Sequence, residues 1–392
     1  MTGTSVDAVD YALVNLDDRD AAADRPWTLR ARIEAAGETA WPDDLRARLT
    51  RLILDPGAES LPGLIELDAE VGTFLGTVAR AVCREAGRVD LIVCPGQTIF
   101  HHTRGGRTLG TLALGNPARV HHETGLPVLS HVRDADIAAG GTGAPLAPIL
   151  DALLAGDTGG CFVNIGGIAN LTVVSALGAG IIAGDTGPGN ALIDAAALVR
   201  TGHPVDEGGT LAASGQIHAP LLTALLADPY FAQGFPKSTG REHFGPALVD
   251  EAARRIDLAL DDLPAPDLLA TLTELTARSI ARAIQDAAPG HTEVHLTGGG
   301  AKNTHLVTRL AALLHPRAVR TGRISGVDPD AKEAVLMALI GYLSASGLPA
   351  ALPPATGARA PALLGSLTPA TGLVARQTPT TLPHHLTVED RS

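Results

Sequence analysis

The feature that most constrains this fold is a helix-then-strand unit that occurs twice, far apart in the sequence. Between residues 64 and 82 apolar residues recur at steps of three and four, which predicts one buried face of a helix. We expect this helix to end at Gly87, and the short apolar run at residues 89–94 then predicts a buried strand. The same order returns with a helix at residues 268–284, a stop at Pro289 and Gly290, and a strand at residues 294–296. Such a unit is typical of α/β folds.

The length of the chain predicts two lobes. Single hydrophobic cores usually stop growing near roughly 250–300 residues, and this chain has 392. Hydrophobic residues make up 45% of it and charged residues 18%, which favours compact folding over disorder. Two strand–turn–strand patterns, around residues 3–5 and around Gly166 and Gly167, stand near the start of each half. The tail at residues 371–392 has no periodicity, so we expect it to be poorly ordered.

Charge, cysteine content and hydropathy indicate the partners and the compartment to expect. Thirty basic and forty-two acidic side chains give a net charge of −12 without a basic stripe, so nucleic acid is not an expected partner. Cys83, Cys94 and Cys161 are odd in number and far apart, which indicates buried thiols of a reducing compartment. No apolar run reaches the roughly 18 residues of a membrane span, and no signal peptide pattern opens the chain. We therefore expect a cytoplasmic protein without a membrane partner.

Two glycine turns between apolar stretches are candidates for phosphate binding. The segment GTSVDAVD at residues 3–10 can bring backbone N–H groups against phosphate oxygens, and Asp7 and Asp10 suit a magnesium ion. An ordinary hairpin turn is the alternative. In NIGGIANLT at residues 164–172 the paired glycines permit close approach of backbone to a ligand. A tight turn without ligand explains this second segment equally well.

Two further glycine turns follow expected strands. In GDTGPGN at residues 184–190, Asp185 is expected at a strand end beside a helix N-terminus, where it acts either as a general base or as a plain helix cap. The segment LTGGGAKN at residues 296–303 can receive a nucleotide or a phosphate, although it lacks the spacing of a Walker loop or a GxGxxG motif. A polar loop with Lys237, Arg241 and His243 either touches an anionic group or is solvated.

Taken in order, these segments resemble the phosphate and adenosine loops of the sugar kinase, heat-shock-70 and actin superfamily. The chain resembles one family in particular, the anhydro-N-acetylmuramic acid kinases. The resemblance runs from residue 2 to residue 335 and rests on TGTSVDAVD, GQTIFHH, GNPARV, DIAAGGTGAPLAP, NIGGIANLT, DTGPGNALID, FPKSTGREHF, GGGAKN and PDAKEAV.

This resemblance implies an α/β, two-lobed actin-like ATPase fold in which each lobe is a ribonuclease-H-like mixed sheet flanked by helices. It implies a first lobe at residues 1–130, mainly sugar-binding and completed by residues 330–370. The second lobe, at residues 131–329, is then mainly ATP-binding, and a cleft separates the lobes. The resemblance also implies a homodimer.

The implied reaction hydrolyses the 1,6-anhydro bridge of anhydro-N-acetylmuramic acid and phosphorylates O6 from ATP with Mg²⁺, giving N-acetylmuramic acid 6-phosphate. Asp185 matches the family's catalytic base, which draws a proton from the attacking water. The ATP-binding residues implied are Gly3, Thr4, Ser5, Val6, Asp7, Ala8, Val9, Asp10, Gly166, Gly167, Gly298, Gly299 and Gly300, with Asp7 and Asp10 as magnesium ligands. The sugar-binding residues are Gln97, Thr98, His101, Arg133, Asn170 and Glu333. Among these, Arg133 suits the lactyl carboxylate and Glu333 a sugar hydroxyl.

The chain departs from the family pattern at its start and at single positions. Family members usually carry an apolar strand before the first loop, whereas Met1 here directly precedes Thr2. We therefore expect either an upstream start or a first sheet that lacks half a hairpin. Residues unusual for the family stand at Ala8, Pro95, Ala113, His131 and Thr142. Two alternatives stay open: a kinase of another amino sugar on the same fold, and a non-catalytic nucleotide-binding sensor.

Overall fold

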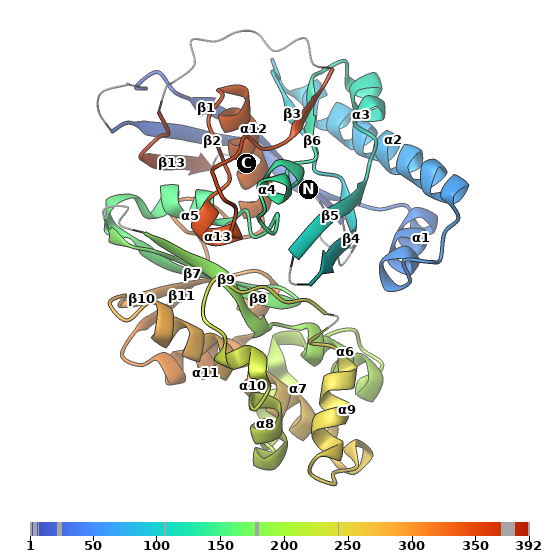
Figure 1. Ribbon diagram of the computed structural model, residues 1–392, viewed down its shortest axis with the longest axis vertical. Helices are drawn as coiled ribbons and strands as arrows, with labels where there is room; N and C mark the ends of the chain where they lie inside the picture. Colours follow the sequence, from blue (N-terminus) through green and yellow to red (C-terminus); the bar gives the residue numbers. More distant parts are fainter. Residues whose placement is uncertain are drawn as a thin grey trace. The chain divides into compact units, whose positions relative to one another are not determined.

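The computed structural model divides the chain into two compact units, drawn in Figure 1. The structure describes residues 2, 6, 8–21, 26–105, 107–176, 180–241, 243–369 and 381–390. Unit 1 comprises Met1–Gly156 and Ile324–Ser392, and unit 2 comprises Asp157–Arg323. Both units combine helices with strands, so the predicted α/β class is confirmed.

Unit 2 contains a mixed five-stranded sheet in the order β11-β10-β7-β8-β9. The neighbours β7, β8 and β9 pair antiparallel, whereas β10 pairs in parallel with both β7 and β11. This is the strand order of the ribonuclease-H-like sheet that the resemblance implies. The strands are β7 (Gly160–Ile165), β8 (Ile168–Val174), β9 (Ile181–Pro188), β10 (Glu293–Thr297) and β11 (Ala318–Thr321).

The helices of unit 2 pack into two hydrophobic clusters joined by one long helix, α10. They are α6 (Ala191–Thr201), α7 (Thr210–Ser214), α8 (Ala219–Leu226), α9 (Pro246–Arg254), α10 (Ala265–Ala287) and α11 (Thr304–Leu314). The apolar face predicted for α10 is confirmed, because Leu272, Ile280 and Ile284 are fully buried. Its first half packs with α6, α8 and α9, and its second half packs on the sheet with α11. The helix therefore supports the sheet and the helical layer together.

Unit 1 carries two three-stranded sheets and a hairpin among its described residues, in place of one continuous mixed sheet. The sheets have the orders β1-β2-β13 and β12-β6-β3, and β4 pairs with β5. The strands are β1 (Ala8–Asp17), β2 (Thr28–Ala40), β3 (Ile92–Val93), β4 (Gln97–Arg104), β5 (Arg107–Leu114), β6 (Val128–Ser130), β12 (Ser366–Thr368) and β13 (His385–Asp390). The helices are α1 (Asp43–Leu54), α2 (Leu61–Glu85), α3 (Pro117–Thr124), α4 (Asp134–Ala138), α5 (Pro148–Ala155), α12 (Lys332–Ala345) and α13 (Pro353–Thr356).

The helix predicted around residues 64–82 is confirmed as α2. It starts after Ser60, whose side-chain Oγ accepts a hydrogen bond from the backbone N–H of Gly63 at 3.2 Å. Its face at Leu67, Val71 and Leu75 is buried against a core shared with α1, α3 and the start of β1. The strand that follows is shorter than predicted, since β3 spans only Ile92–Val93.

Two expectations about boundaries are wrong. Residues 131–156, expected in the second lobe, lie in unit 1, where α5 packs beside β13. The tail expected to be poorly ordered from residue 371 contains β13, which pairs in parallel with β2 and fully buries Leu386. The tail strand could not be predicted, because one buried leucine in a polar segment leaves no periodic signal. Its partner strand β2 is also about 350 positions away in the sequence.

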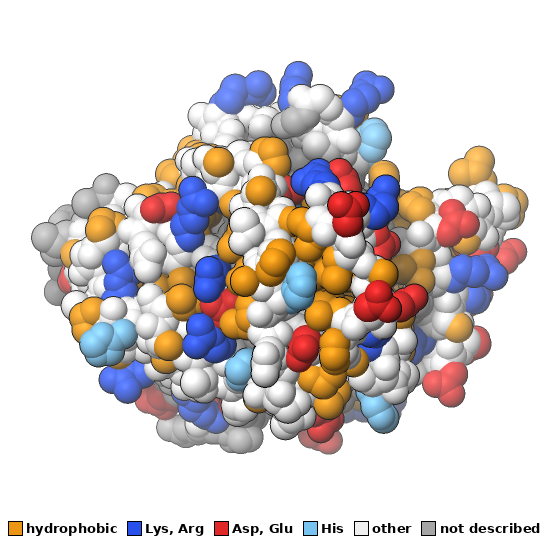
Figure 2. Space-filling model, turned by 90° about the horizontal axis from the view of Figure 1, so that it is seen from below, with side chains coloured by type: hydrophobic (Ala, Val, Ile, Leu, Met, Phe, Trp, Pro, Cys, Tyr) orange, Lys and Arg blue, Asp and Glu red, His pale blue; other side chains and the backbone are white. Residues whose placement is uncertain are grey.

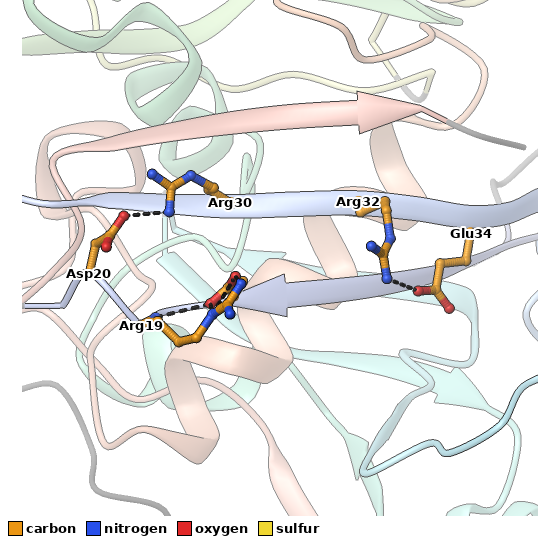
Figure 3. Close-up of polar contacts among 6 residues, drawn as sticks. Arg19, Asp20, Arg30, Arg32 and Glu34 are labelled. Atoms are coloured by element: carbon orange, nitrogen blue, oxygen red, sulfur yellow. Dashed lines mark hydrogen bonds and ion pairs between the residues drawn. The ribbon is translucent and has the colours of Figure 1, made fainter.

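The surface carries charges of both signs. Along the β1–β2 hairpin, Arg32 forms an ion pair with Glu34 at 2.7 Å, and Arg30 pairs with Asp20 (Figure 3). The face drawn in Figure 2 shows acidic and basic side chains interspersed with hydrophobic ones, several of which adjoin one another near the centre of the view. Within the described ranges, no helix has the length and apolar character needed to cross a membrane.

Candidate active site

Asp185 is held in a fixed orientation inside β9 of unit 2. The pairing of β8 with β9 shifts register between Ala169 and Asn170, so a β-bulge places Asp185 opposite Asn170. Bulges often re-aim a side chain next to an active site. The Asp185 carboxylate accepts hydrogen bonds from the backbone N–H of Thr239 at 2.8 Å and from the hydroxyl of Ser238 at 3.1 Å. Both donors stabilise the ionised carboxylate.

The backbone of Asp185 is fixed as firmly as its side chain. Its N–H donates to the carbonyl oxygen of Lys237 at 2.8 Å, and its carbonyl oxygen accepts from the hydroxyl of Tyr230 at 2.9 Å. Burial, reinforced by the charge of Asp185, raises the pKa of Tyr230, so the phenol stays a donor. Gly184 has φ +153°, and a Cβ there would lie 2.6 Å from the Lys237 carbonyl oxygen, so a glycine is required for this close approach.

The ammonium group of Lys237 packs on Tyr230. It donates to the Tyr230 carbonyl oxygen at 3.2 Å and lies 4.5 Å from the centroid of that ring. Burial lowers the pKa of Lys237, as does the nearby Arg282. The part of this polar loop from Lys237 to Thr239 positions Asp185.

Three glycine turns of unit 2 meet at one end of its sheet. The turn at Gly166 and Gly167 accepts three backbone hydrogen bonds, from Gly189, Asn190 and Ala191, at 2.8 to 3.0 Å. A Cβ on Gly298 would lie 2.6 Å from Oδ1 of Asn164, and one on Gly300 would lie 2.3 Å from Ile165. The second phosphate segment, the DTGPGN segment and the GGG segment are thus neighbours.

Helix α6 begins at this meeting point and presents its N-terminus there. Asn190 occupies the cap position, so the alternative reading of Asp185 as the helix cap is wrong.

A Cβ on Gly167 would lie 2.8 Å from the Arg241 guanidinium, which therefore packs on the turn. Burial raises the pKa of Asp194 in the first turn of α6 to about 6, and Arg241 partly opposes the shift. A helix dipole and a guanidinium at one place can attract a phosphate.

A polar row crosses the same end of the sheet. Asn164 in β7 stands opposite Asn170 in β8, and Asn170 stands opposite Asp185 in β9. Thr297 of β10 pairs with Asn164 on the other side. Directly opposite residues in neighbouring strands share a face. Asn170 and Asp185, expected from the sequence as sugar contact and base, therefore lie side by side.

In unit 1, the expected sugar residues Gln97 and Thr98 begin β4. Gln97 is fully buried, accepts a hydrogen bond from the hydroxyl of Thr2, and donates to the Thr98 carbonyl oxygen at 3.1 Å. His101 lies farther along the β4–β5 hairpin, where its side chain is exposed. Gln97 is thus a fixed interior residue, whereas His101 is a surface residue of the hairpin.

Arg133 lies against a tight loop in the segment DIAAGGTGAPLAP. Its guanidinium donates to the Gly143 carbonyl oxygen at 2.7 Å. The fully buried Asp136 accepts from the N–H of Gly143 at 2.8 Å and from the hydroxyl of Thr356 at 2.7 Å. A Cβ on Gly141 would clash with the Asp136 carboxylate at 2.3 Å. Asp136 therefore shapes the loop that holds Arg133.

Glu333 and Arg133 are electrostatically coupled within unit 1. Burial lowers the pKa of Arg133, and the charge of Glu333 opposes that shift. Glu333 is exposed in the first turn of α12. Burial raises the pKa of Asp10 in β1, and the acids Glu333, Glu38 and Asp330 raise it further. Asp10 thus sits in an acidic environment that a divalent cation would relieve.

The family model described as anhydro-N-acetylmuramic acid kinase matches this chain over residues 1–370. This chain belongs to the anhydro-N-acetylmuramic acid kinase family. A relative of that name from Streptomyces avermitilis is 42% identical over 377 residues, which cover 94% of this chain and 93% of the relative. Another from Gloeobacter violaceus is 40% identical over 384 residues and covers 94% and 97%. The crystal structure of xylulose kinase from Rhodospirillum rubrum is 16% identical, with a TM-score of 0.31, over 62% of this chain and 51% of that one.

Membership in the anhydro-N-acetylmuramic acid kinase family makes the chain one of a family of ATP-using phosphotransferases and confirms the resemblance seen in the sequence. Four of the expected ATP-loop positions, Gly3, Thr4, Ser5 and Asp7, lie outside the described residues. Of the other positions in the segment from residue 3 to residue 10, Val6 and Val9 are buried in the core of unit 1, and Ala8 and Asp10 belong to β1.

Sequence reasoning missed the residues that hold the expected ones. Ser238 and Thr239 are 53 and 54 positions from Asp185, and Thr356 is 220 positions from Asp136. The sequence offered one signal for Asp136, which is the single acidic residue in the otherwise small and apolar stretch DIAAGGTGAP. A carboxylate buried in such a stretch must be hydrogen-bonded, so a structural role could have been expected.

Proposed function

We propose that this chain is an ATP-dependent kinase of anhydro-N-acetylmuramic acid. Water adds to the anomeric carbon, the 1,6-anhydro C1–O bond breaks, and the released O6 takes the γ-phosphoryl group. The products are N-acetylmuramic acid 6-phosphate and ADP. The observation that carries this proposal is the Asp185 carboxylate of the DTGPGN segment, fixed by Thr239 and Ser238 in a chain whose relatives bear this kinase name.

Asp185 acts as the general base. An ionised carboxylate with defined orientation can accept the proton of an attacking water, which contributes about 10²–10⁴-fold to the rate. Two donors fix the Asp185 carboxylate, and Tyr230 and Lys237 fix its backbone, so little reorganisation is needed when water binds. Asn170 on the neighbouring strand is a sugar-contacting residue in this proposal.

Unit 2 binds mainly ATP and unit 1 binds mainly the sugar. For ATP, the Arg241 guanidinium beside Gly167 and the dipole of α6 attract phosphate oxygens, and the segment from Gly298 to Gly300 receives the adenosine. For the sugar, Arg133 recognises the lactyl carboxylate, Glu333 a hydroxyl, and Thr98 contributes a hydrogen bond, while the fully buried Gln97 positions the start of β4.

Magnesium fits the acidic surroundings of Asp10. Among the described residues no group of three possible ligands occurs, which agrees with the usual binding of Mg²⁺ by one or two carboxylates together with substrate phosphates. The ion neutralises phosphate charge when bound with ATP. Asp10 would hold it together with Asp7, which lies outside the described residues. The proposal also includes a homodimer that works in the cytoplasm, which light scattering and cell fractionation test.

The decisive experiment follows one oxygen atom. Purified protein is incubated with MgATP and anhydro-N-acetylmuramic acid in H₂¹⁸O, and the product is analysed by mass spectrometry. We expect simultaneous gain of one water and one phosphoryl group, with ¹⁸O at the anomeric carbon and unlabelled oxygen in the phosphate ester. The matched control is Asp185→Asn, which should bind ATP and give almost no product.

Two other results would assign the chain elsewhere. Phosphorylation of N-acetylmuramic acid or another free amino sugar, with no turnover of the anhydro form, would make it a different sugar kinase. Binding of ATP in calorimetry without ADP release in the presence of any of these sugars would make it a nucleotide sensor.

A further inference from the structure

A pocket of about 300 Å³ lies within unit 2, beside the loop that holds Asp185. It is formed by β9, by the second half of α10 and by the chain between Leu226 and Lys237. Of the residues that the sequence singled out for anion or nucleotide binding, Lys237 alone lines it. Its volume is at the lower end of the range of small-molecule sites. The pocket can therefore hold one compact ligand.

Positive charge gathers at this pocket. The charged residues that line it are three basic ones and one acidic one, Lys237, Arg278, Arg282 and Asp286. Nε of Arg282 lies 3.9 Å from Oδ2 of Asp286, and both side chains are more than half exposed. Arg278 pairs with Glu274 at 2.7 Å, but that carboxylate is shared with Arg309 at 2.8 Å. The protein therefore leaves part of the positive charge at the pocket without a counter-charge.

Lys237 presents its ammonium group to carbonyl and ring partners. The group donates to the Tyr230 carbonyl oxygen at 3.2 Å and lies 4.5 Å and 5.5 Å from the ring centroids of Tyr230 and Phe235. In the described part of the chain, no carboxylate forms an ion pair with it. An ammonium group has three donors, so this one has donors left for a ligand.

The two cations nearest the loop disfavour each other. Burial lowers the pKa of Lys237 and Arg282 lowers it further, whereas the charges of Asp286 and Asp185 raise it. An anion beside both cations would replace their repulsion by attraction. The pocket therefore gains most from a ligand whose negative charge contacts Lys237 and Arg282 together.

The rest of the pocket wall is apolar. Ile182 of β9, Leu226, Phe231 and Phe235 line it. The Phe231 ring is fixed in place, because it is 7% exposed and packs on Phe244 with ring centroids 5.6 Å apart. A ligand that fills the pocket must therefore carry a compact apolar group together with its negative charge.

The charge balance favours phosphate over carboxylate. Three basic and one acidic lining residues leave an excess of two positive charges. A phosphate monoester carries about −1.5 to −2 charges at pH 7 and offers three acceptor oxygens. A carboxylate carries a single charge. Arg and Lys side chains are the usual partners of phosphate groups.

The same wall connects the pocket to Asp185. The Lys237 carbonyl oxygen accepts from the N–H of Asp185 at 2.8 Å, and the N–H of Thr239 donates to the Asp185 carboxylate at 2.8 Å. A ligand that holds the Lys237 side chain therefore restricts the backbone that orients this carboxylate.

We propose that this pocket binds a phosphate monoester with a compact apolar group, and that the bound ligand restrains the segment from Lys237 to Thr239 around Asp185. The phosphate group contacts Lys237 and Arg282, and the apolar group contacts Phe231 and Phe235. The binding claim does not depend on the kinase reaction, because it concerns a second ligand and is measured without turnover.

Calorimetry with phenyl phosphate tests the binding claim. Inorganic phosphate supplies the anion alone, and benzyl alcohol supplies the apolar part alone. All titrations contain saturating MgADP, so that the nucleotide site is occupied. The variants are Arg282→Met and Arg282→Lys, and the matched control is Arg255→Met at the end of α9. Both arginines are more than half exposed and pair with an acid four positions away in the sequence, so neither change should disturb folding.

We expect phenyl phosphate to bind at least tenfold more tightly than inorganic phosphate or benzyl alcohol. Arg282→Met should weaken this binding at least fivefold, whereas Arg282→Lys should lose less and Arg255→Met nothing. Hydrogen exchange tests the restraint: phenyl phosphate should slow exchange of the amides from Lys237 to Thr239 at least threefold in the wild-type protein. In Arg282→Met the same concentration of phenyl phosphate should slow it less.

Several results would overturn the proposal. Absence of binding, or equal affinity in wild type and Arg282→Met, would remove the ligand from this pocket. Binding seen only without MgADP would place phenyl phosphate in the nucleotide site. Inorganic phosphate or benzyl alcohol binding as tightly as phenyl phosphate would contradict the assigned ligand class. Binding without slower exchange from Lys237 to Thr239 would refute the restraint on Asp185.

Discussion

Replacement of Lys332 by methionine should destabilise unit 1 strongly. The ammonium group of Lys332, at the start of α12, lies 2.6 Å from Oδ1 of Asp151 in α5, and the two side chains are 8% and 3% exposed. Removing one partner of such a buried pair leaves an uncompensated charge in the interior and costs about 3–5 kcal/mol. With an m value of about 2 kcal/mol/M, the urea midpoint falls by about 1.5–2.5 M.

The assay can observe unit 1 by itself. The chain has two tryptophans, Trp27 and Trp41, and both are buried in unit 1. Their fluorescence during urea titration therefore reports the unfolding of unit 1 even if unit 2 unfolds separately. The matched control is Arg32→Met, which removes the exposed ion pair with Glu34 drawn in Figure 3. Exposed pairs contribute at most about 1 kcal/mol, so the midpoint should hardly move.

A double variant separates charge from packing. Lys332→Met combined with Asp151→Leu removes both charges, and hydrophobic replacement of a buried pair is often neutral or stabilising. We expect it to recover most of the loss caused by Lys332→Met alone. A loss below about 1 kcal/mol for the single variant, or an equal loss for the single and double variants, would refute the reasoning.

Three further predictions concern unit 2. Asp185→Asn should lower turnover by about 10²–10⁴-fold with ATP affinity kept, measured by coupled ADP release and calorimetry; near wild-type turnover would remove Asp185 from the base role. Gly298→Ala should weaken ATP binding at least tenfold, since Gly298 has φ +80° and a Cβ there would lie 2.6 Å from Asn164, whereas Gly290→Ala, with open space around it, should change nothing. Asp194→Asn should remove a pH dependence: burial raises the folded pKa of Asp194 to about 6, so ionisation costs stability as pH rises from about 4 through 6. The variant should melt at a higher temperature than wild type at pH 8 and at the same temperature below pH 4; an equal difference at both pH values would contradict this.

The sequence by itself determined the local elements and the residues of the candidate site that sit on them. Helices α2 and α10 follow from apolar spacing, because periodicity is a property of neighbouring residues. The turns at Gly166 and Gly298 follow from glycines that admit close backbone approach. Asp185 could be named because it lies between an apolar run and a recognisable helix start, although the structure places it inside β9 and not at the strand's end.

Only the tertiary structure decided what surrounds those residues. The donors from Ser238 and Thr239 to Asp185, the bond from Thr356 to Asp136, and the pair of Lys332 with Asp151 each join segments far apart in the chain. The pairing of β13 with β2 likewise depends on which strands become neighbours. Local spacing carries no record of these choices, because chain topology brings distant residues together only after the elements have packed.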